Sequence, residues 1–143
     1  MKRIVLTLAV ALSLAPLAAM ACGNDSPQQA SAQPSKATVA QVATWTKEKK
    51  ATPVDANGSE TRSKQGVIPG AVLLTSSSQY AVNELPADKN SKLVFYCASE
   101  MCGASHAAAK RAMENGYTDV SVLPEGIAGW KKAGQKTAKP NNT

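Results

Sequence analysis

Two cysteines of this chain, Cys97 and Cys102, are the side chains best suited to covalent chemistry. Cys97 ends an apolar stretch that predicts a strand over residues 92–97, and an alanine-rich stretch that predicts a helix begins near Ser105. The short loop between them aims backbone N–H groups and the positive end of the helix dipole at the Cys97 sulfur. Negative charge is favoured there, so we expect a thiolate, which is the nucleophilic form of cysteine.

Cys102 lies five positions after Cys97 on the same loop and leaves two interpretations open. In an oxidising compartment it can form a disulfide with Cys97, which would mask the nucleophile until the bond is reduced. Alternatively, its thiol packs against the loop and shares the loop amides. We expect no metal site, because Cys97, Cys102 and His106 offer at most three ligands and the chain has no other histidine.

Other polar and aromatic residues have mainly supporting roles. Glu100, on the loop, opposes the binding of anions and acts to raise the pKa of Cys97, against the effect of the amides. His106 is expected to face solvent, because the first turn of a helix disfavours imidazolium. Asp55 is expected to organise the edge of the sheet through hydrogen bonds, and Trp45 and Trp130 to anchor the core.

The rest of the chain alternates between strand and helix patterns. The predicted strands are residues 52–56, 71–74, 92–97 and 119–123, and the predicted helices are residues 39–49, 105–115 and 127–132, with a helical turn within 80–85. This order implies an α/β fold in which a parallel β-sheet is flanked by helices on both faces. Functional groups collect at the carboxyl ends of such strands, and Cys97 lies at one of these ends.

The N-terminal residues indicate export. Residues 1–21 have the charged start, apolar centre and small-residue end of a signal peptide. Cys22 follows directly, in a pattern that resembles the lipobox of bacterial lipoproteins, although Ala19 stands where leucine is usual. We therefore expect an extracytoplasmic protein, in the periplasm or cell envelope, with a lipid anchor on Cys22. The alternative is ordinary secretion with a free Cys22 thiol.

Composition defines the remaining organisation. Residues 22–37 are rich in Ser, Gln, Ala and Pro and predict a flexible tether, residues 38–138 a single domain, and residues 139–143 a disordered tail. The net charge of +6 comes from scattered lysines, and aromatic residues make up 4% of the chain. This composition argues against nucleic-acid binding and is typical of a soluble domain, which we expect to be monomeric.

Three segments together resemble the rhodanese-like family. They are Val54-Asp55-Ala56-Asn57 with Gly66-Val67-Ile68-Pro69-Gly70-Ala71, then Val94-Phe95-Tyr96-Cys97 with its loop and helix, and finally Leu123-Pro124-Glu125-Gly126-Ile127-Ala128-Gly129-Trp130. They occur in the family's order and span residues 38–136.

The resemblance implies a sulfurtransferase. Cys97 would be the nucleophile that takes sulfane sulfur from an anionic donor such as thiosulfate, or from a persulfide, and passes it to a thiophilic acceptor such as cyanide or a protein thiol. The amides of the loop, Ala98, Ser99, Glu100, Met101, Cys102 and Gly103, would bind the donor and the persulfide. This chemistry requires neither a metal nor an organic cofactor.

The chain also departs from the family pattern. The arginine that family members commonly carry at the end of the loop is missing. Asn57 replaces a second arginine, often found two residues after the aspartate, and Val67 stands where histidine is frequent. Arg62 and Lys64 are candidates for the missing cation, against the alternative that both are solvated surface charges. The absent arginine disfavours a phosphatase. Two other functions remain open: a thiol–disulfide redox protein that uses Cys97 and Cys102, and a non-catalytic module that binds an anion or a partner.

Overall fold

The computed structural model describes residues 33–140, which form an α/β domain. The predicted signal peptide, the lipidation site Cys22 and most of the predicted tether lie outside these residues, as do the last three residues of the predicted tail. Among residues 33–140, every helix is too short or too polar to span a membrane.

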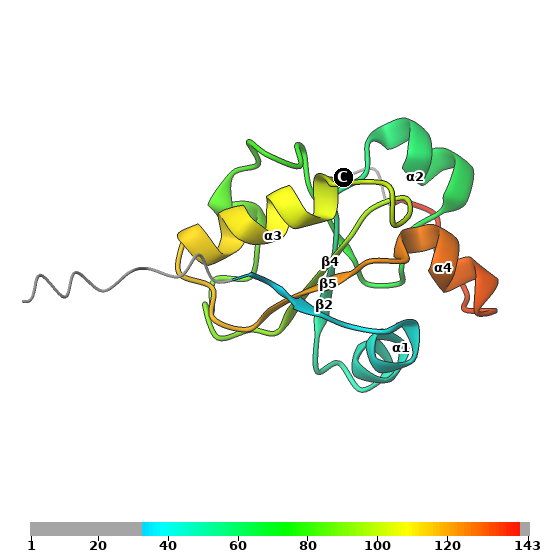
Figure 1. Ribbon diagram of the computed structural model, residues 1–143, viewed down its shortest axis with the longest axis horizontal. Helices are drawn as coiled ribbons and strands as arrows, with labels where there is room; N and C mark the ends of the chain where they lie inside the picture. Colours follow the sequence, from blue (N-terminus) through cyan, green and yellow to red (C-terminus); the bar gives the residue numbers. More distant parts are fainter. Residues whose placement is uncertain (1–32, 141–143) are drawn as a thin grey trace, which may run out of the picture. The chain divides into compact units, whose positions relative to one another are not determined.

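Five parallel strands form the sheet, in the order β1-β5-β4-β2-β3. The strands are β1 (Ser35–Lys36), β2 (Thr52–Asp55), β3 (Val72–Leu73), β4 (Leu93–Tyr96) and β5 (Val120–Leu123). The helices are α1 (Val39–Lys47), α2 (Ser59–Gln65), α3 (Ala104–Glu114) and α4 (Gly126–Lys132), and η1 (Val82–Glu84) is a short 3₁₀-helix. Figure 1 shows α3 and α1 on opposite sides of the central strands. The predicted fold class is confirmed.

Strand β4 lies at the centre of the sheet and is buried on both faces. Leu93 and Phe95 point toward α3, whereas Val94 and Tyr96 point toward α1 and α4. Each fully buried apolar side chain of this size contributes about 1.5–3 kcal/mol to folding. Because β4 carries this density of contacts, the residue that follows it, Cys97, leaves the sheet from a rigid position.

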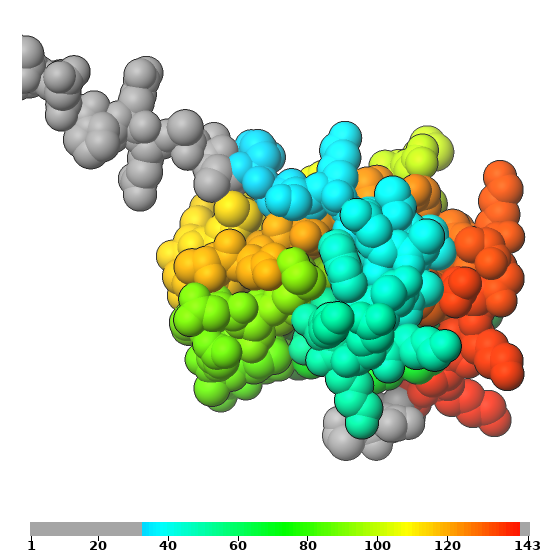
Figure 2. Space-filling view, turned by 90° about the horizontal axis from the view of Figure 1, so that it is seen from below, coloured from blue at the N-terminus to red at the C-terminus, as the bar shows by residue number. Residues whose placement is uncertain are grey.

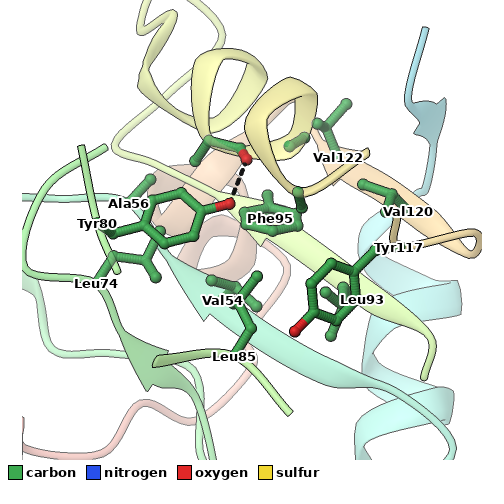
Figure 3. Packing of buried hydrophobic residues seen from close by; sticks show 13 residues of the cluster. Val54, Ala56, Leu74, Tyr80, Leu85, Leu93, Phe95, Tyr117, Val120 and Val122 are labelled. Atoms are coloured by element: carbon green, nitrogen blue, oxygen red, sulfur yellow. Dashed lines mark hydrogen bonds between the residues drawn. The ribbon is translucent and has the colours of Figure 1, made fainter. Parts of the chain in front are cut away.

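Helix α3 packs closely on one face of the sheet through small side chains. Ala108, Ala109 and Ala112 are buried there, so the helix backbone approaches the strands. Figure 3 shows this cluster, in which the Tyr80 hydroxyl donates a hydrogen bond of 2.9 Å to the Ala108 carbonyl oxygen. This bond fixes the first half of α3, the part nearest the cysteine loop.

The opposite face is covered by α1 and α4. Val42 of α1 and Ile127 and Trp130 of α4 are buried against Val94 and Tyr96. The Trp130 indole N–H donates a hydrogen bond of 2.9 Å to the Lys136 carbonyl oxygen, and Trp45 packs against the same cluster. Both tryptophans therefore lie in or against the core, as expected. Figure 2 shows this side of the domain, with α1 in cyan and the segment after α4 in orange and red.

Two elements were not predicted. Helix α2 has no buried residue, so it lacks the apolar spacing that identifies a helix, and it ends at Gly66, whose φ of +76° suits glycine. Strand β1 has two exposed side chains. It pairs with β5, and the next residue, Ala37, is buried and donates an N–H bond of 2.8 Å to the Val122 carbonyl oxygen. Residues 35–37, which the sequence assigns to the tether, thus pair with the edge of the sheet.

Candidate active site

Cys97 follows β4 directly, and residues 98–103 connect it to α3. Helix α4 holds the start of this loop: the Ile127 N–H donates to the Cys97 carbonyl oxygen (2.9 Å), and the Ala128 N–H to the Ala98 carbonyl oxygen (3.0 Å). Gly126 makes this approach possible. Its φ is +60°, and a Cβ atom there would lie 2.8 Å from the Ala98 carbonyl carbon. The motif at residues 123–130 therefore positions the loop that follows Cys97.

The Cys97 sulfur faces carbonyl oxygens. Its Sγ lies 2.9 Å from the Cys102 carbonyl oxygen and 3.8 Å from that of Ser99, and only 1% of the residue is exposed. A thiol can donate a hydrogen bond to a carbonyl oxygen, whereas a thiolate is repelled by it. The predicted ring of loop amides around Cys97 is therefore wrong for this conformation. The reason is the turn in which the Cys102 N–H donates to the Ser99 carbonyl oxygen (3.0 Å), which directs carbonyl groups toward Cys97.

Burial raises the pKa of the Cys97 thiol, and its hydrogen bond to Cys102 raises it further. Ser105 acts in the opposite direction. Its hydroxyl oxygen lies 3.4 Å from Cys97 Sγ, and both the hydroxyl and the backbone N–H of Ser105 stabilise the thiolate. Sequence reasoning assigned Ser105 only to the start of a helix. Its position as a polar residue in the first turn after the cysteine loop is the signal that identifies it.

The loop N–H groups that were expected to stabilise a thiolate at Cys97 act on Cys102 instead. Burial acts to raise the pKa of Cys102, but hydrogen bonds from the Cys97 thiol and from the N–H groups of Ala104 and Ala98 outweigh burial and lower it. Cys102 is only half-buried, and both thiols are free. The loop thus disfavours a thiolate at Cys97 and makes Cys102 the easier of the two thiols to ionise.

The other loop residues lie nearer to solvent. Ala98 and Ser99 are half-buried, Glu100 and Gly103 are exposed, and Met101 is 98% exposed. His106 is exposed as well, as expected. Among residues 33–140, no group of three or more His, Cys, Asp or Glu side chains is arranged to hold a metal ion.

Arg62 and Lys64 do not lie on a loop but on α2, and the structure gives each of them a partner. The Arg62 guanidinium lies 3.3 Å from the Asp55 carboxylate and donates to the carbonyl oxygens of Asp55 (2.9 Å) and Leu74 (2.8 Å). Lys64 is exposed and pairs with Glu60 at 2.6 Å. The Arg62 charge therefore joins β2, β3 and α2, and a role of Arg62 or Lys64 as the substrate cation stays a prediction.

Asp55 is the centre of this network. It is fully buried, accepts the Asn57 N–H at 2.7 Å and is the register partner of Tyr96 on β4. Burial and the nearby Asp55 carboxylate raise the pKa of Tyr96, whose hydroxyl also accepts the Ile68 N–H at 3.0 Å. Asp55 therefore links the first motif to β4 and organises the edge of the sheet, as expected.

A separate groove of about 940 Å³ lies on the α1 side of the domain. It is bordered by Ala43 and Thr46 of α1, by Pro53 and by Trp130. Its cations are Lys47, Lys49 and Lys136. Trp130 thus closes one side of this groove, and neither cysteine lines it.

A family model described as "Rhodanese-like domain" matches residues 38–133, which include Cys97, its loop and all three motifs. The chain belongs to the rhodanese-like family. A search of curated proteins found no match.

Solved structures support the rhodanese-like fold. The NMR structure of a rhodanese-like domain from Anabaena is 19% identical, with a TM-score of 0.55 over 76% of this chain and 83% of that chain. The human single-domain sulfurtransferase TSTD1 is also 19% identical, with a TM-score of 0.55 over 68% of this chain and 95% of that one. A Rhodopseudomonas palustris protein of unknown function, described as a possible tyrosine phosphatase, is 25% identical, with a TM-score of 0.60 over 73% of this chain and 85% of that chain.

Proposed function

We propose that this rhodanese-like protein is a sulfurtransferase in which Cys97 is the nucleophile. It takes sulfane sulfur from a small anionic donor such as thiosulfate, or from a persulfide, and passes it to a thiol or to cyanide. The observation that carries the proposal is the position of Cys97, which leaves the central strand β4 and lies next to the first turn of α3 in the region that the family model matches.

The first step is the attack on the donor. Cys102 ionises more easily than Cys97, and in its thiolate form it takes the proton of the Cys97 thiol, which lies against the Cys102 carbonyl group. The Cys97 thiolate then attacks the outer sulfur of thiosulfate, whose S–S bond breaks, and sulfite leaves with the electron pair of that bond. The product is a persulfide on Cys97. Because only 1% of Cys97 is exposed, the donor reaches it when residues 98–103 move outward.

Negative charge at this site is stabilised without a guanidinium, since residues 98–103 contain no arginine. The Ser105 N–H and hydroxyl already contact the Cys97 sulfur, and the positive end of α3, an 11-residue helix, adds to their effect. Point donors of this kind suit a sulfur anion. The lack of an arginine in residues 98–103 also disfavours a phosphatase, because a phosphoryl group is held best by a bidentate guanidinium.

We also propose an extracytoplasmic location with a lipid anchor on Cys22, on the basis of the N-terminal sequence pattern. The expected result is that cells incorporate labelled fatty acid into the wild-type chain but not into Cys22→Ser. Equal labelling of both chains, or of neither, would contradict the anchor.

The activity is tested by incubating reduced protein with thiosulfate and measuring the sulfite released. The wild type and Cys102→Ser should both release sulfite, whereas Cys97→Ser should release none. Intact-mass spectrometry of Cys102→Ser should show the gain of one sulfur atom, which dithiothreitol removes. If neither the wild type nor Cys102→Ser releases sulfite from thiosulfate or accepts sulfur from a persulfide, the proposed function is wrong.

A second candidate function is thiol–disulfide exchange, which is favoured by two free cysteines in contact on one loop. It predicts that a mild disulfide oxidant removes two hydrogens from the protein, while thiosulfate and persulfides leave its mass unchanged.

A further inference from the structure

The two cysteines of the loop are already in contact. Cys97 Sγ lies 2.9 Å from the carbonyl oxygen of Cys102, so the backbone of the second cysteine lies against the sulfur of the first. Both are free, and four residues separate them along the chain. A disulfide requires its two sulfurs to approach to about 2.05 Å. The loop therefore brings a second sulfur to the point where the proposed persulfide forms.

We propose that Cys102 resolves the persulfide on Cys97, so that the protein releases hydrosulfide and is left with a Cys97–Cys102 disulfide. This inference rests on the proposed sulfurtransferase function and names the first acceptor of its sulfur, which is a thiol of the same loop. The sulfane sulfur is then reduced rather than transferred intact.

The step is balanced without any further reactant. Cys102, which gained a proton in the first step, passes it to the outer sulfur of the persulfide, while the Cys102 sulfur attacks the inner one. The bond between the inner and outer sulfurs breaks, the Cys97–Cys102 bond forms, and hydrosulfide leaves with the electron pair. The outer sulfur is reduced by two electrons, and the two cysteine sulfurs are oxidised to the disulfide.

Burial favours this internal route over direct transfer to a bulky external thiol. Cys97 is 1% exposed, so such a thiol must first displace the loop, whereas Cys102 already contacts the Cys97 sulfur through its carbonyl oxygen. A reacting group held in place in this way has an effective concentration far above that of a dissolved thiol. The amides of Ala98 and Ala104 stabilise Cys102 as a thiolate, the form that attacks.

The disulfide also defines the class of the second substrate. Cys102 is the more exposed of the two sulfurs, so an external thiol reaches the disulfide there and leaves Cys97 as the departing thiol. A dithiol completes the reduction within one complex, because its second sulfur displaces the mixed disulfide. The partner that restores the enzyme is therefore a dithiol reductant.

A single turnover without reductant tests the proposal. Reduced full-length protein is mixed with excess thiosulfate, and sulfite, hydrosulfide and the state of each cysteine are measured, the last by peptide mapping, which keeps Cys22 separate. The wild type should release one equivalent each of sulfite and hydrosulfide and contain the Cys97–Cys102 disulfide. His106→Ala, altered at an exposed residue of α3 just after the loop, should behave like the wild type.

Cys102→Ser and Cys102→Ala should release sulfite more slowly, because the Cys97 proton must pass to solvent, but should retain the sulfur on Cys97 and give hydrosulfide only when dithiothreitol is added. The proposal is overturned if the wild type releases sulfite and keeps the persulfide while Cys102 remains a free thiol, a result that leaves the sulfurtransferase function standing. The absence of sulfite from the wild type and from both variants would instead overturn the sulfurtransferase function itself. The wild-type measurement alone is decisive if the variants fail to fold.

Discussion

Two neighbouring strands end in different ways. At the end of β2, the buried Asp55 is surrounded by Arg62, Asn57 and Tyr96, and these contacts join three elements. At the end of β4, Cys97 enters a loop with two free thiols, whose sulfur contacts are with the loop itself and with Ser105. Asp55 and Tyr96 are register partners, so the two regions adjoin. The difference indicates that ionic groups hold the β2 end of this edge, whereas the β4 end offers two free sulfurs for the proposed chemistry.

The largest effect is expected at Asp55. Asp55→Ala leaves the Arg62 guanidinium, whose side chain is 12% exposed, without its charge partner. Removing one member of a buried ion pair costs about 3–5 kcal/mol of unfolding free energy. Urea unfolding followed by circular dichroism measures this loss. A change below about 1 kcal/mol, the range of surface pairs, would contradict the account of the β2 end.

Arg62→Gln separates the structural interpretation of this arginine from a role in substrate binding. The variant should lose stability because the bonds to Asp55 and Leu74 are weakened. Its KM for thiosulfate, measured where the protein is still folded, should match that of the wild type. A raised KM with unchanged stability would show that Arg62 binds the donor after all.

The next largest effect is expected at Gly126, where α4 meets the cysteine loop. Gly126→Ala introduces a left-handed non-glycine residue, which costs about 1–2 kcal/mol, and its Cβ would also overlap the Ala98 backbone. Both stability and sulfite release should fall. Gly134→Ala is the matched control, since Gly134 has a φ of +74° but open space around a Cβ. Equal effects on sulfite release in the two variants would mean that α4 does not position the loop.

Ser105→Ala is expected to have a smaller effect, which changes the reaction rate and not the stability of the fold. The Ser105 hydroxyl stabilises the Cys97 thiolate, so its removal raises the pKa of Cys97 and lowers the thiolate fraction at a fixed pH. Loss of a hydrogen bond worth ~1 kcal/mol corresponds to about a fivefold fall in rate. The rate should rise with pH in both proteins, with the rise displaced to higher pH in the variant. An unchanged pH profile would remove Ser105 from the site, and the exposed His106→Ala is the control.

The smallest effect is expected for Lys64→Ala. Lys64 and Glu60 form an exposed pair on α2, which typically contributes less than about 1 kcal/mol. Neither urea unfolding nor sulfite release should differ measurably from the wild type. A clear loss of activity would restore Lys64 as the substrate cation and erase the contrast between the two strand ends.

The sequence was sufficient to predict β4, α3 and the parallel sheet because these elements bury most of their side chains. The alternation of Leu93, Val94, Phe95 and Tyr96 between two apolar faces, and the alanines of α3, are direct consequences of that packing. Helix α2 and strand β1 could not be predicted in the same way. Their side chains contribute little to the core. Strand β1 is held by its pairing with β5, and α2 by the Arg62 side chain, which bonds to Asp55 and Leu74.

The location of the candidate site was predicted from the sequence, but the direction in which the peptide groups of its loop point was not. Residue types place Cys97 at the end of a strand, yet they do not determine which way each peptide group of the loop points. That orientation depends on the turn between Ser99 and Cys102 and on the bonds from Ile127 and Ala128 to the start of the loop. These tertiary contacts turn carbonyl oxygens toward Cys97 and amides toward Cys102, which reverses the expected pKa shift at Cys97.

The most direct test of the central claim is the location of the sulfur that thiosulfate donates to Cys102→Ser. Peptide mapping of this variant after reaction should find a persulfide on Cys97, together with one equivalent of released sulfite. A variant that releases no sulfite and leaves the Cys97 thiol unmodified, while remaining folded, would contradict the assignment of Cys97 as the nucleophile.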